Sequence, residues 1–168
     1  MLPGIGTRTG NRKNVSGTEA LYWADIAIGE ELVSADTAIA ERDIKEFAIE
    51  FDPQPYHLDS EAGDNSIFGG LCASGWHVTA VMMRLLTDSF AARQIELLGL
   101  SSVSRVSWRK PVFANDCLKS TLVVAKKSAS DDARYGYIEC DVDVTNQHGQ
   151  SVIILNTTLM VATGPEEK

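Results

Sequence analysis

The longest hydrophobic stretch of the chain runs from Ala73 to about Phe90, and its polar residues do not gather on one side. A helix that is apolar on most of its surface is typical of a protein interior rather than of an exposed face. Ser74 can cap such a helix, and Gly75 in the first turn leaves backbone N–H groups accessible. The pattern therefore predicts one long, buried central helix.

A second helical pattern lies in ERDIKEFAIEFD, where Ile44, Phe47 and Ala48 share one face. This helix is expected to end near Phe51, because Pro53 disfavours the α conformation in the residue before it. The following SEAGDNSIF predicts a further turn of helix.

Strand patterns occupy the second half of the chain, and turn residues separate them. Closely spaced strands of this kind predict an antiparallel meander. Near the N-terminus, LYWADIAIGEELVS predicts a short strand, a turn at Gly29-Glu30 and a second strand that reaches about Ala40. One buried helix and a large antiparallel sheet indicate an α+β domain in which the sheet wraps the helix. The four later segments are SSVSRVSWRKPV, CLKSTLVVAKK, ARYGYIECDVDVTN and QSVIILNTTLMVAT.

The chain has 168 residues, which suits one domain with a full hydrophobic core. Residues 1–17 contain four glycines and no hydrophobic period, and they predict a flexible arm. Residues 18–168 then form a single domain. No apolar run reaches the length of about 18 residues that a membrane span needs, and no secretory signal is evident.

Composition narrows the class of function further. The net charge of −8 argues against nucleic-acid binding, which depends on clustered Lys and Arg. The three cysteines, Cys72, Cys117 and Cys140, have no spacing that suggests a disulfide framework or a zinc site. A cytoplasmic location is therefore expected.

Asp52 and His57 are separated by two prolines in FDPQPYHLDS, and the prolines leave this link few conformations. A carboxylate and an imidazole beside one water molecule can act as a general acid–base pair. Alternatively, Asp52 is only a residue of the helix C-terminal turn, and His57 is a partly buried side chain bonded to a carbonyl. His57 and Asp59 could also be half of a metal site, but no third ligand is evident.

The segments DPQPYHLD and FGGLCASGWH, followed by a long apolar helix, resemble the MaoC-like dehydratases and the (R)-specific enoyl-CoA hydratases. SWRKPVFANDCLKSTLVV is similar to the family pattern v-x-F-x-x-P-V-x-x-G-D-x-L. The resemblance spans roughly Leu21 to Thr163. It implies a hot-dog fold, in which an antiparallel sheet wraps a long central helix, and it implies a homodimer.

The resemblance also implies roles for three residues. Asp52 and His57 would activate a water molecule that adds to C3 of a trans-2-enoyl-CoA. The backbone N–H of Gly75 would polarise the thioester carbonyl at a helix N-terminus, where the helix dipole favours negative charge. No metal or redox cofactor is implied, and coenzyme A enters only as part of the acyl-CoA substrate.

Several positions depart from the family pattern. Gln54 replaces an asparagine, and Ser74 stands where a histidine is usual. Met83 replaces a serine that supports the catalytic aspartate in some hydratases, which leaves the orientation of Asp52 open. Trp76 and His77 occupy positions that are usually smaller or apolar.

Further substrate-binding candidates are Ser74, Trp76, His77 and Arg84. His77 and Arg84 share a helix face and could reach a polar acyl tail. Alternatively, His77 bonds to a nearby carbonyl and Arg84 pairs with an acidic residue at the helix end. Trp76 could close a short acyl pocket or belong to the core. Basic residues that could bind the CoA phosphates are Arg109 and Lys110, with Arg105, Lys119, Lys126 and Lys127 as weaker candidates.

Two other functions stay open at this point. A hot-dog acyl-CoA thioesterase shares the fold, but such enzymes typically use a carboxylate of the central helix, and none lies between Ala73 and Arg84. A non-catalytic acyl-CoA-binding module would explain Met83, whereas the Asp52 and His57 pair argues for catalysis.

Overall fold

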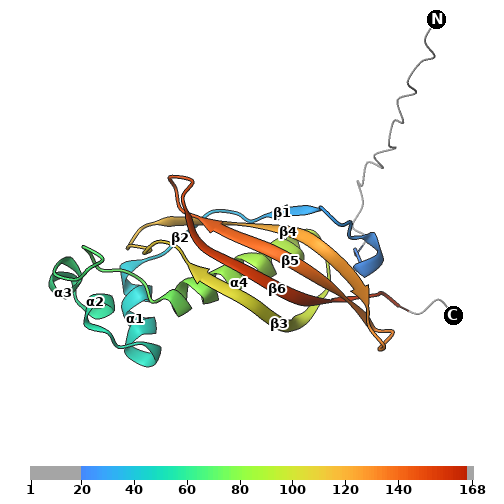
Figure 1. Ribbon diagram of the computed structural model, residues 1–168, viewed down its shortest axis with the longest axis horizontal. Helices are drawn as coiled ribbons and strands as arrows, with labels where there is room; N and C mark the ends of the chain where they lie inside the picture. The colour runs from blue at the N-terminus through green and yellow to red at the C-terminus, as the bar shows by residue number, and fades with distance from the viewer. Residues whose placement is uncertain (1–19, 166–168) are drawn as a thin grey trace, which may run out of the picture.

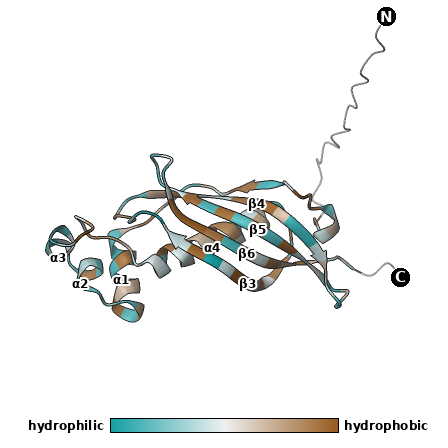
Figure 2. Cartoon of the chain, in the orientation of Figure 1, coloured by the Kyte–Doolittle hydropathy of each residue, from teal (hydrophilic) through white to brown (hydrophobic). Residues whose placement is uncertain are grey.

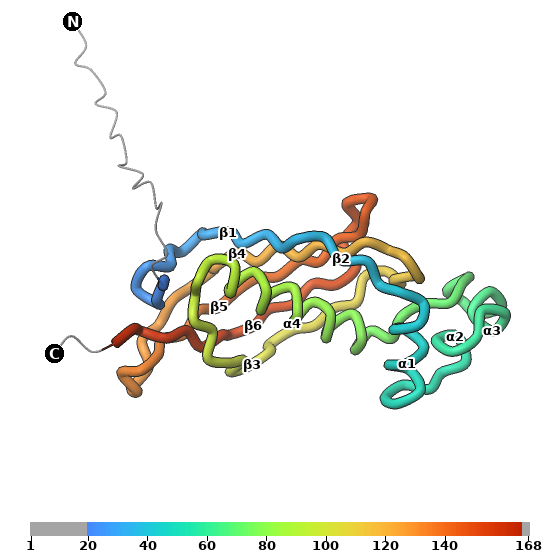
Figure 3. The backbone as a smooth tube through the Cα atoms, turned by 180° about the vertical axis from the view of Figure 1, so that it is seen from behind, coloured from blue at the N-terminus to red at the C-terminus, as the bar shows by residue number. Residues whose placement is uncertain are grey.

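A six-stranded antiparallel sheet lies along one long helix, α4 (Gly75–Ala92), as Figures 1 and 3 show from opposite sides. The computed structural model describes residues 20–165. The predicted arm, residues 1–17, lies outside this range. The α+β architecture expected from the sequence is confirmed, and α4 is the predicted central helix. The expectation that this helix is buried on most of its surface is wrong for one face, because Trp76 and Arg84 are exposed.

The sheet order differs from a simple meander. Strands β4, β5 and β6 follow one another as expected, but β3 pairs with β6 at the edge and not with β4. Residues 109–116 connect β3 to β4 across three strand spacings of about 4.8 Å each. Eight residues are long enough for this crossing, since an extended residue spans about 3.3 Å. The strand bounds are β1 Glu31–Val33, β2 Thr37–Ala38, β3 Leu97–Trp108, β4 Cys117–Ala129, β5 Tyr135–Thr145 and β6 Ser151–Ala162.

This order lets the sheet wrap the helix. The two strands that precede α4, β1 and β2, both pair with β4, and β1 forms one edge of the sheet. The strand after α4, β3, lies at the other edge. The short connection between β3 and β4 therefore does not join neighbouring strands of the sheet. Covering α4 from both edges buries more of its apolar surface than a meander on one side would.

The first predicted strand is wrong. Trp23–Asp25 forms a 3-10 helix, η1, and Leu21 makes only an isolated bridge to Ile95. The indole of Trp23 donates a hydrogen bond to the Tyr137 carbonyl (3.0 Å) and so anchors this segment on β5. The turn at Gly29 is confirmed by its φ of 82°, but two short strands, β1 and β2, replace the single long strand expected after it.

Three short helices gather beyond one end of the sheet (Figures 1 and 3). Helix α1 ends at Phe51, as the proline at position 53 predicted. Helix α2 has Pro55 at its start, and α3 supplies the turn of helix expected in SEAGDNSIF. Their bounds are α1 Glu41–Phe51, α2 Pro55–Leu58 and α3 Ser60–Asp64.

The core lies between the sheet and α4. Along β4, every second residue from Leu118 to Val124 is buried, and Figure 2 shows the same alternation of hydrophobic and hydrophilic bands on the neighbouring strands. Met82, Leu86 and Phe90 of α4 belong to the same buried cluster. Truncating one such side chain typically costs about 2–5 kcal/mol of unfolding free energy.

Within residues 20–165, no helix is long and apolar enough to cross a membrane. The three cysteines are free thiols.

Candidate active site

Asp52 and His57 are brought together by the tight chain between α1 and α2. Asp52 caps the C-terminus of α1, and its carbonyl accepts a hydrogen bond from the Gln54 N–H (2.7 Å). The Gln54 carbonyl then accepts one from the His57 N–H (2.9 Å). The His57 Nε2 atom consequently lies 3.5 Å from Asp52 Oδ2. The expected convergence of these two side chains is present.

The buried ring of His57 has a defined orientation. Its Nδ1 lies 2.6 Å from the Cys72 carbonyl oxygen, which can only accept a hydrogen bond. Nδ1 therefore carries the proton, and Nε2 faces Asp52. The carbonyl bond that a purely structural interpretation of His57 expected is present, and it is the bond that turns Nε2 toward the carboxylate.

Ser74 positions Asp52 from the start of α4. Its buried hydroxyl donates to Asp52 Oδ2 (2.7 Å), the same oxygen that faces His57. The hydroxyl also accepts a long bond from the Trp76 N–H (3.3 Å), which confirms the predicted N-cap. Met83 instead packs against the core. Asp52 thus has a hydroxyl donor although Met83 stands at the position of the family's serine.

A cavity of about 320 Å³ opens beside this group, and His57 and Gly75 both line it. Gly75 is the first residue of α4, so its N–H has no acceptor within the helix. Asp52 does not line the cavity and meets it through His57. The other lining residues are Tyr56, Phe68, Cys72, Ala73, Val78, Trp108, Arg109, Lys110, Pro111, Val112 and Val152.

Four of the six predicted substrate-binding residues lie outside this cavity. Ser74 contacts Asp52 instead, as described above. Trp76 is 60% exposed and packs edge-on against Trp108, with 5.1 Å between ring centroids. His77 is buried and stacks on Phe47 (4.8 Å). Arg84 is exposed and pairs with Asp88 (2.8 Å), the acidic partner considered as its alternative. Arg109 and Lys110, in contrast, lie at the cavity as proposed for phosphate contacts.

Cys72 is the thiol of the cavity, and its Sγ lies 3.8 Å from His57 Nδ1. Burial raises the pKa of the Cys72 thiol. The thiol therefore stays protonated at neutral pH and is a poor nucleophile. This leaves the Asp52 carboxylate and the His57 imidazole as the candidate reactive groups of the site.

Asp59, the second aspartate of DPQPYHLD, caps α3 and accepts a hydrogen bond from the Ala62 N–H (2.9 Å). Its role in the structure is thus local. Among residues 20–165, no group of three or more His, Cys, Asp or Glu side chains is arranged to hold a metal ion.

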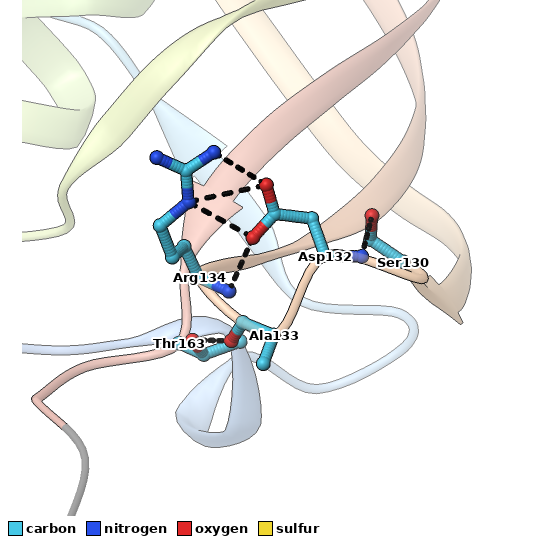
Figure 4. Close-up of polar contacts among 5 residues, drawn as sticks. All are labelled: Ser130, Asp132, Ala133, Arg134 and Thr163. Carbon is cyan, nitrogen blue, oxygen red and sulfur yellow. Dashed lines mark hydrogen bonds and ion pairs between the residues drawn. The ribbon is translucent and has the colours of Figure 1, made fainter.

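A larger cavity, about 860 Å³, lies at the opposite end of the sheet and is lined by Tyr22, Leu98 and Met160, among others. Glu96 and Arg134 are the charged residues that line this cavity. Arg134 is paired with Asp132 in the loop between β4 and β5 (Figure 4). The Arg134 guanidinium lowers the pKa of the Asp132 carboxyl to about 2. Both partners are surface groups that satisfy each other, so this cavity offers no comparable reactive pair.

Comparison with known proteins places the chain in a family. A MaoC-like dehydratase from Rhodospirillum rubrum has 37% sequence identity and a TM-score of 0.76, over 87% of this chain and 99% of that one. The R-hydratase PhaJ1 from Pseudomonas aeruginosa has 25% identity and a TM-score of 0.59, over 88% of each chain.

The uncharacterized protein YdeM of Bacillus subtilis (strain 168) is 29% identical over 104 residues, which are 61% of this chain and 72% of YdeM. Residues 24–146 match the MaoC like domain. The chain therefore belongs to the MaoC-like family and has its hot-dog fold.

Proposed function

We propose that this protein is a hydro-lyase that adds water across the C2–C3 double bond of a trans-2-enoyl-CoA and catalyses the reverse dehydration. The observation that carries the proposal is the arrangement of Ser74, Asp52 and His57 beside the Gly75 amide at one cavity. The similarity to a MaoC-like dehydratase and to an R-hydratase supports the same reaction class.

The geometry of the pair suits the activation of water. Asp52 Oδ2 and His57 Nε2 lie 3.5 Å apart, close enough for one water molecule to donate a hydrogen bond to each. The water oxygen then has a free lone pair for C3. We assign the removal of the water proton and the later proton delivery to the pair as a unit.

In the hydration direction, the water oxygen forms the bond to C3 while one water proton moves to the pair. The electrons of the C2–C3 double bond move toward the thioester and give an enolate. The Gly75 N–H at the start of α4 stabilises the enolate oxygen. A proton from the pair then goes to C2, so the elements of one water molecule are added and the pair is regenerated.

The cavity supports a small acyl group. Its volume of about 320 Å³ is near the lower end of the range of small-molecule sites, about 300–1,000 Å³. Arg109 and Lys110 on the cavity support coenzyme A as the thioester carrier, because Arg and Lys are the usual donors to phosphate. No further cofactor is required by this chemistry.

Ser74 takes a positioning role in this proposal, because its hydroxyl is fully buried against Asp52. Trp76, His77 and Arg84 take no part in it, since Trp76 packs on Trp108, His77 stacks on Phe47 and Arg84 pairs with Asp88. A homodimer is proposed through the edge of the sheet, where β3 exposes Leu98, Leu100 and Val103. An exposed hydrophobic edge strand is a ready surface for pairing with a second chain.

The proposal is tested by following loss of the conjugated enoyl-thioester absorbance with crotonyl-CoA, a longer enoyl-CoA and an enoyl-CoA that carries a carboxylate. We expect turnover of crotonyl-CoA and its loss in the Asp52→Asn variant, which keeps the shape of the side chain. Retention of most of the wild-type rate in Asp52→Asn would overturn the assignment. Release of free thiol from a saturated acyl-CoA would instead indicate a thioesterase.

A further inference from the structure

Trp108, the last residue of β3, lies directly against the first turn of α4. Its indole Nε1 donates a hydrogen bond to the Gly75 carbonyl (2.8 Å) and lies 3.3 Å from Thr79 Oγ1. The Thr79 hydroxyl donates to the same carbonyl (2.9 Å). The peptide that follows Gly75 is therefore held by side chains from both the sheet and the helix.

The contact depends on the absence of a side chain at position 75. A Cβ atom on Gly75 would lie 2.8 Å from Trp108 Nε1 and 2.9 Å from Trp108 Cε2, closer than real Cβ atoms approach. The ring thus occupies the space that a side chain at position 75 would fill. The family pattern v-x-F-x-x-P-V has a phenylalanine where this chain has Trp108, and only the tryptophan supplies an N–H group.

The opposite side of Gly75 is fixed as well. Ser74 is buried and bonded to Asp52, so the peptide before Gly75 is anchored to the acid–base pair. Helix ends fray unless their groups are held, and glycine adds conformational freedom. With Trp108 on one side and Ser74 on the other, the Gly75 amide has little freedom to turn away from the cavity that Gly75, His57 and Trp108 all line.

We propose that Trp108 is a positioning residue for the Gly75 amide, and that its indole N–H fixes the first turn of α4 in the orientation that stabilises the enolate oxygen. This inference rests on the proposed hydration of an enoyl thioester. It adds a group outside the aspartate–histidine pair, and it links β3 at the edge of the sheet to the oxygen-binding amide.

The test compares Trp108→Phe with wild type in steady-state hydration of crotonyl-CoA. Phenylalanine keeps an aromatic ring against Gly75 but removes the N–H. A misplaced donor weakens binding of the developing negative charge more than binding of the substrate. We expect kcat to fall about tenfold while KM changes less than about twofold.

Trp23→Phe is the matched control. Trp23 also packs against a glycine, Gly136, and also donates its indole N–H to a backbone carbonyl, that of Tyr137 (3.0 Å), but it lies on η1 away from the cavity. Each variant loses one indole N–H donor, and the control also alters the contact of Lys127 with the Trp23 ring. The control should therefore lower the melting temperature at least as much as Trp108→Phe. Only Trp108→Phe should lower kcat.

Thr79→Val supplies a second measurement should Trp108→Phe fail to fold, because it removes the other side-chain donor to the Gly75 carbonyl. We expect a fall in kcat of about threefold, the size of a single neutral hydrogen bond. Wild-type kcat in Trp108→Phe, or an equal loss in Trp23→Phe, would overturn the inference while the proposed function stands. No turnover of crotonyl-CoA by wild type would overturn both the inference and the proposed function.

Discussion

The two buried histidines of the protein, His57 and His77, have nearly the same exposure, 6% and 8%, but very different surroundings. His57 has a carbonyl at Nδ1 and a carboxylate near Nε2. His77 stacks on Phe47 with an angle of 6° between the rings, and its Nδ1 has no hydrogen-bond partner within the described part of the chain.

The different surroundings of the two rings affect how each histidine can bind a proton. Burial lowers the pKa of His77, and the Asp43 carboxylate opposes this shift only in part. His77 is therefore a neutral packing group at neutral pH. His57, with one nitrogen anchored and the other facing a carboxylate, can exchange a proton while its ring stays in place. Burial alone does not identify a reactive histidine, whereas the partners of both ring nitrogens do.

Among the variants that test the difference between the two histidines, His57→Gln is expected to lower kcat the most. Loss of the imidazole removes one member of the acid–base pair, and general acid–base groups typically contribute about a hundredfold to ten-thousandfold in rate. We expect kcat for crotonyl-CoA hydration to fall within that range with the melting temperature little changed. A fall of less than about threefold would assign His57 to packing, like His77.

Gly75→Ala tests the amide beside His57. Alanine normally stabilises a helix by about 1 kcal/mol relative to glycine, but here its Cβ would lie 2.8 Å from the Trp108 indole. The steric term should dominate, with kcat reduced about a hundredfold and the unfolding free energy lowered by about 1–3 kcal/mol.

Gly99→Ala provides the control for Gly75→Ala, because no atom of the same chain lies within 4 Å of a Cβ atom at position 99. Gly99 lies on the edge strand proposed for the dimer, so the control is accepted only if the variant keeps the wild-type oligomeric state. It should leave kcat and stability near the wild-type values. Equal effects in the two variants would show that the loss at position 75 does not depend on the Trp108 contact.

Ser74→Ala is expected to have a smaller effect on activity. It removes the hydroxyl that orients Asp52 and caps α4, so we expect kcat to fall about tenfold and the unfolding free energy to fall by about 1 kcal/mol. Because Asp52→Asn is expected to lose turnover, the link between the two residues is tested on stability. In an Asp52→Asn background, Ser74→Ala should lower the unfolding free energy by less than it does in wild type. Equal losses in the two backgrounds would contradict the link.

The smallest effect is expected from His77→Phe, and it concerns stability against pH. Because the pKa of His77 is lowered in the folded protein, the unfolded chain binds this proton more readily. The contribution of the neutral His77 ring to the unfolding free energy is complete above about pH 6.5, the ordinary histidine pKa. It is lost as the pH falls through the lowered pKa of the folded state. Wild type should lose unfolding free energy relative to His77→Phe between about pH 7 and about pH 5 in denaturant titrations. A difference in unfolding free energy that stays constant with pH would contradict the neutral state of buried His77.

Local patterns predicted the helices and the proximity of Asp52 and His57. The apolar stretch gave α4, the proline at position 53 gave the end of α1 at Phe51, and the two prolines correctly indicated that Asp52 and His57 converge. Each of these features depends on residues close together in the chain, where backbone restriction and hydrophobic period decide the outcome.

Features that join distant segments were not predicted. The pairing of β3 with β6 depends on how the sheet closes around α4, which strand periodicity does not record. The bond from Ser74 to Asp52 joins residues 22 positions apart, and the Trp108 bond to Gly75 joins residues 33 apart. A serine preceding a glycine and a tryptophan in place of phenylalanine were visible signals, but only the fold shows what they contact.

In the proposed mechanism, Asp52 and His57 direct water to C3 of an enoyl thioester. Its most direct test is to run the crotonyl-CoA reaction in water enriched in heavy oxygen and to locate the label by mass spectrometry. We predict label in the 3-hydroxyl group of an intact hydroxyacyl-CoA with wild type, and no labelled product with Asp52→Asn. Label in the carboxylate of a free acid, together with released thiol, would contradict the account, because water would then have attacked the thioester carbonyl.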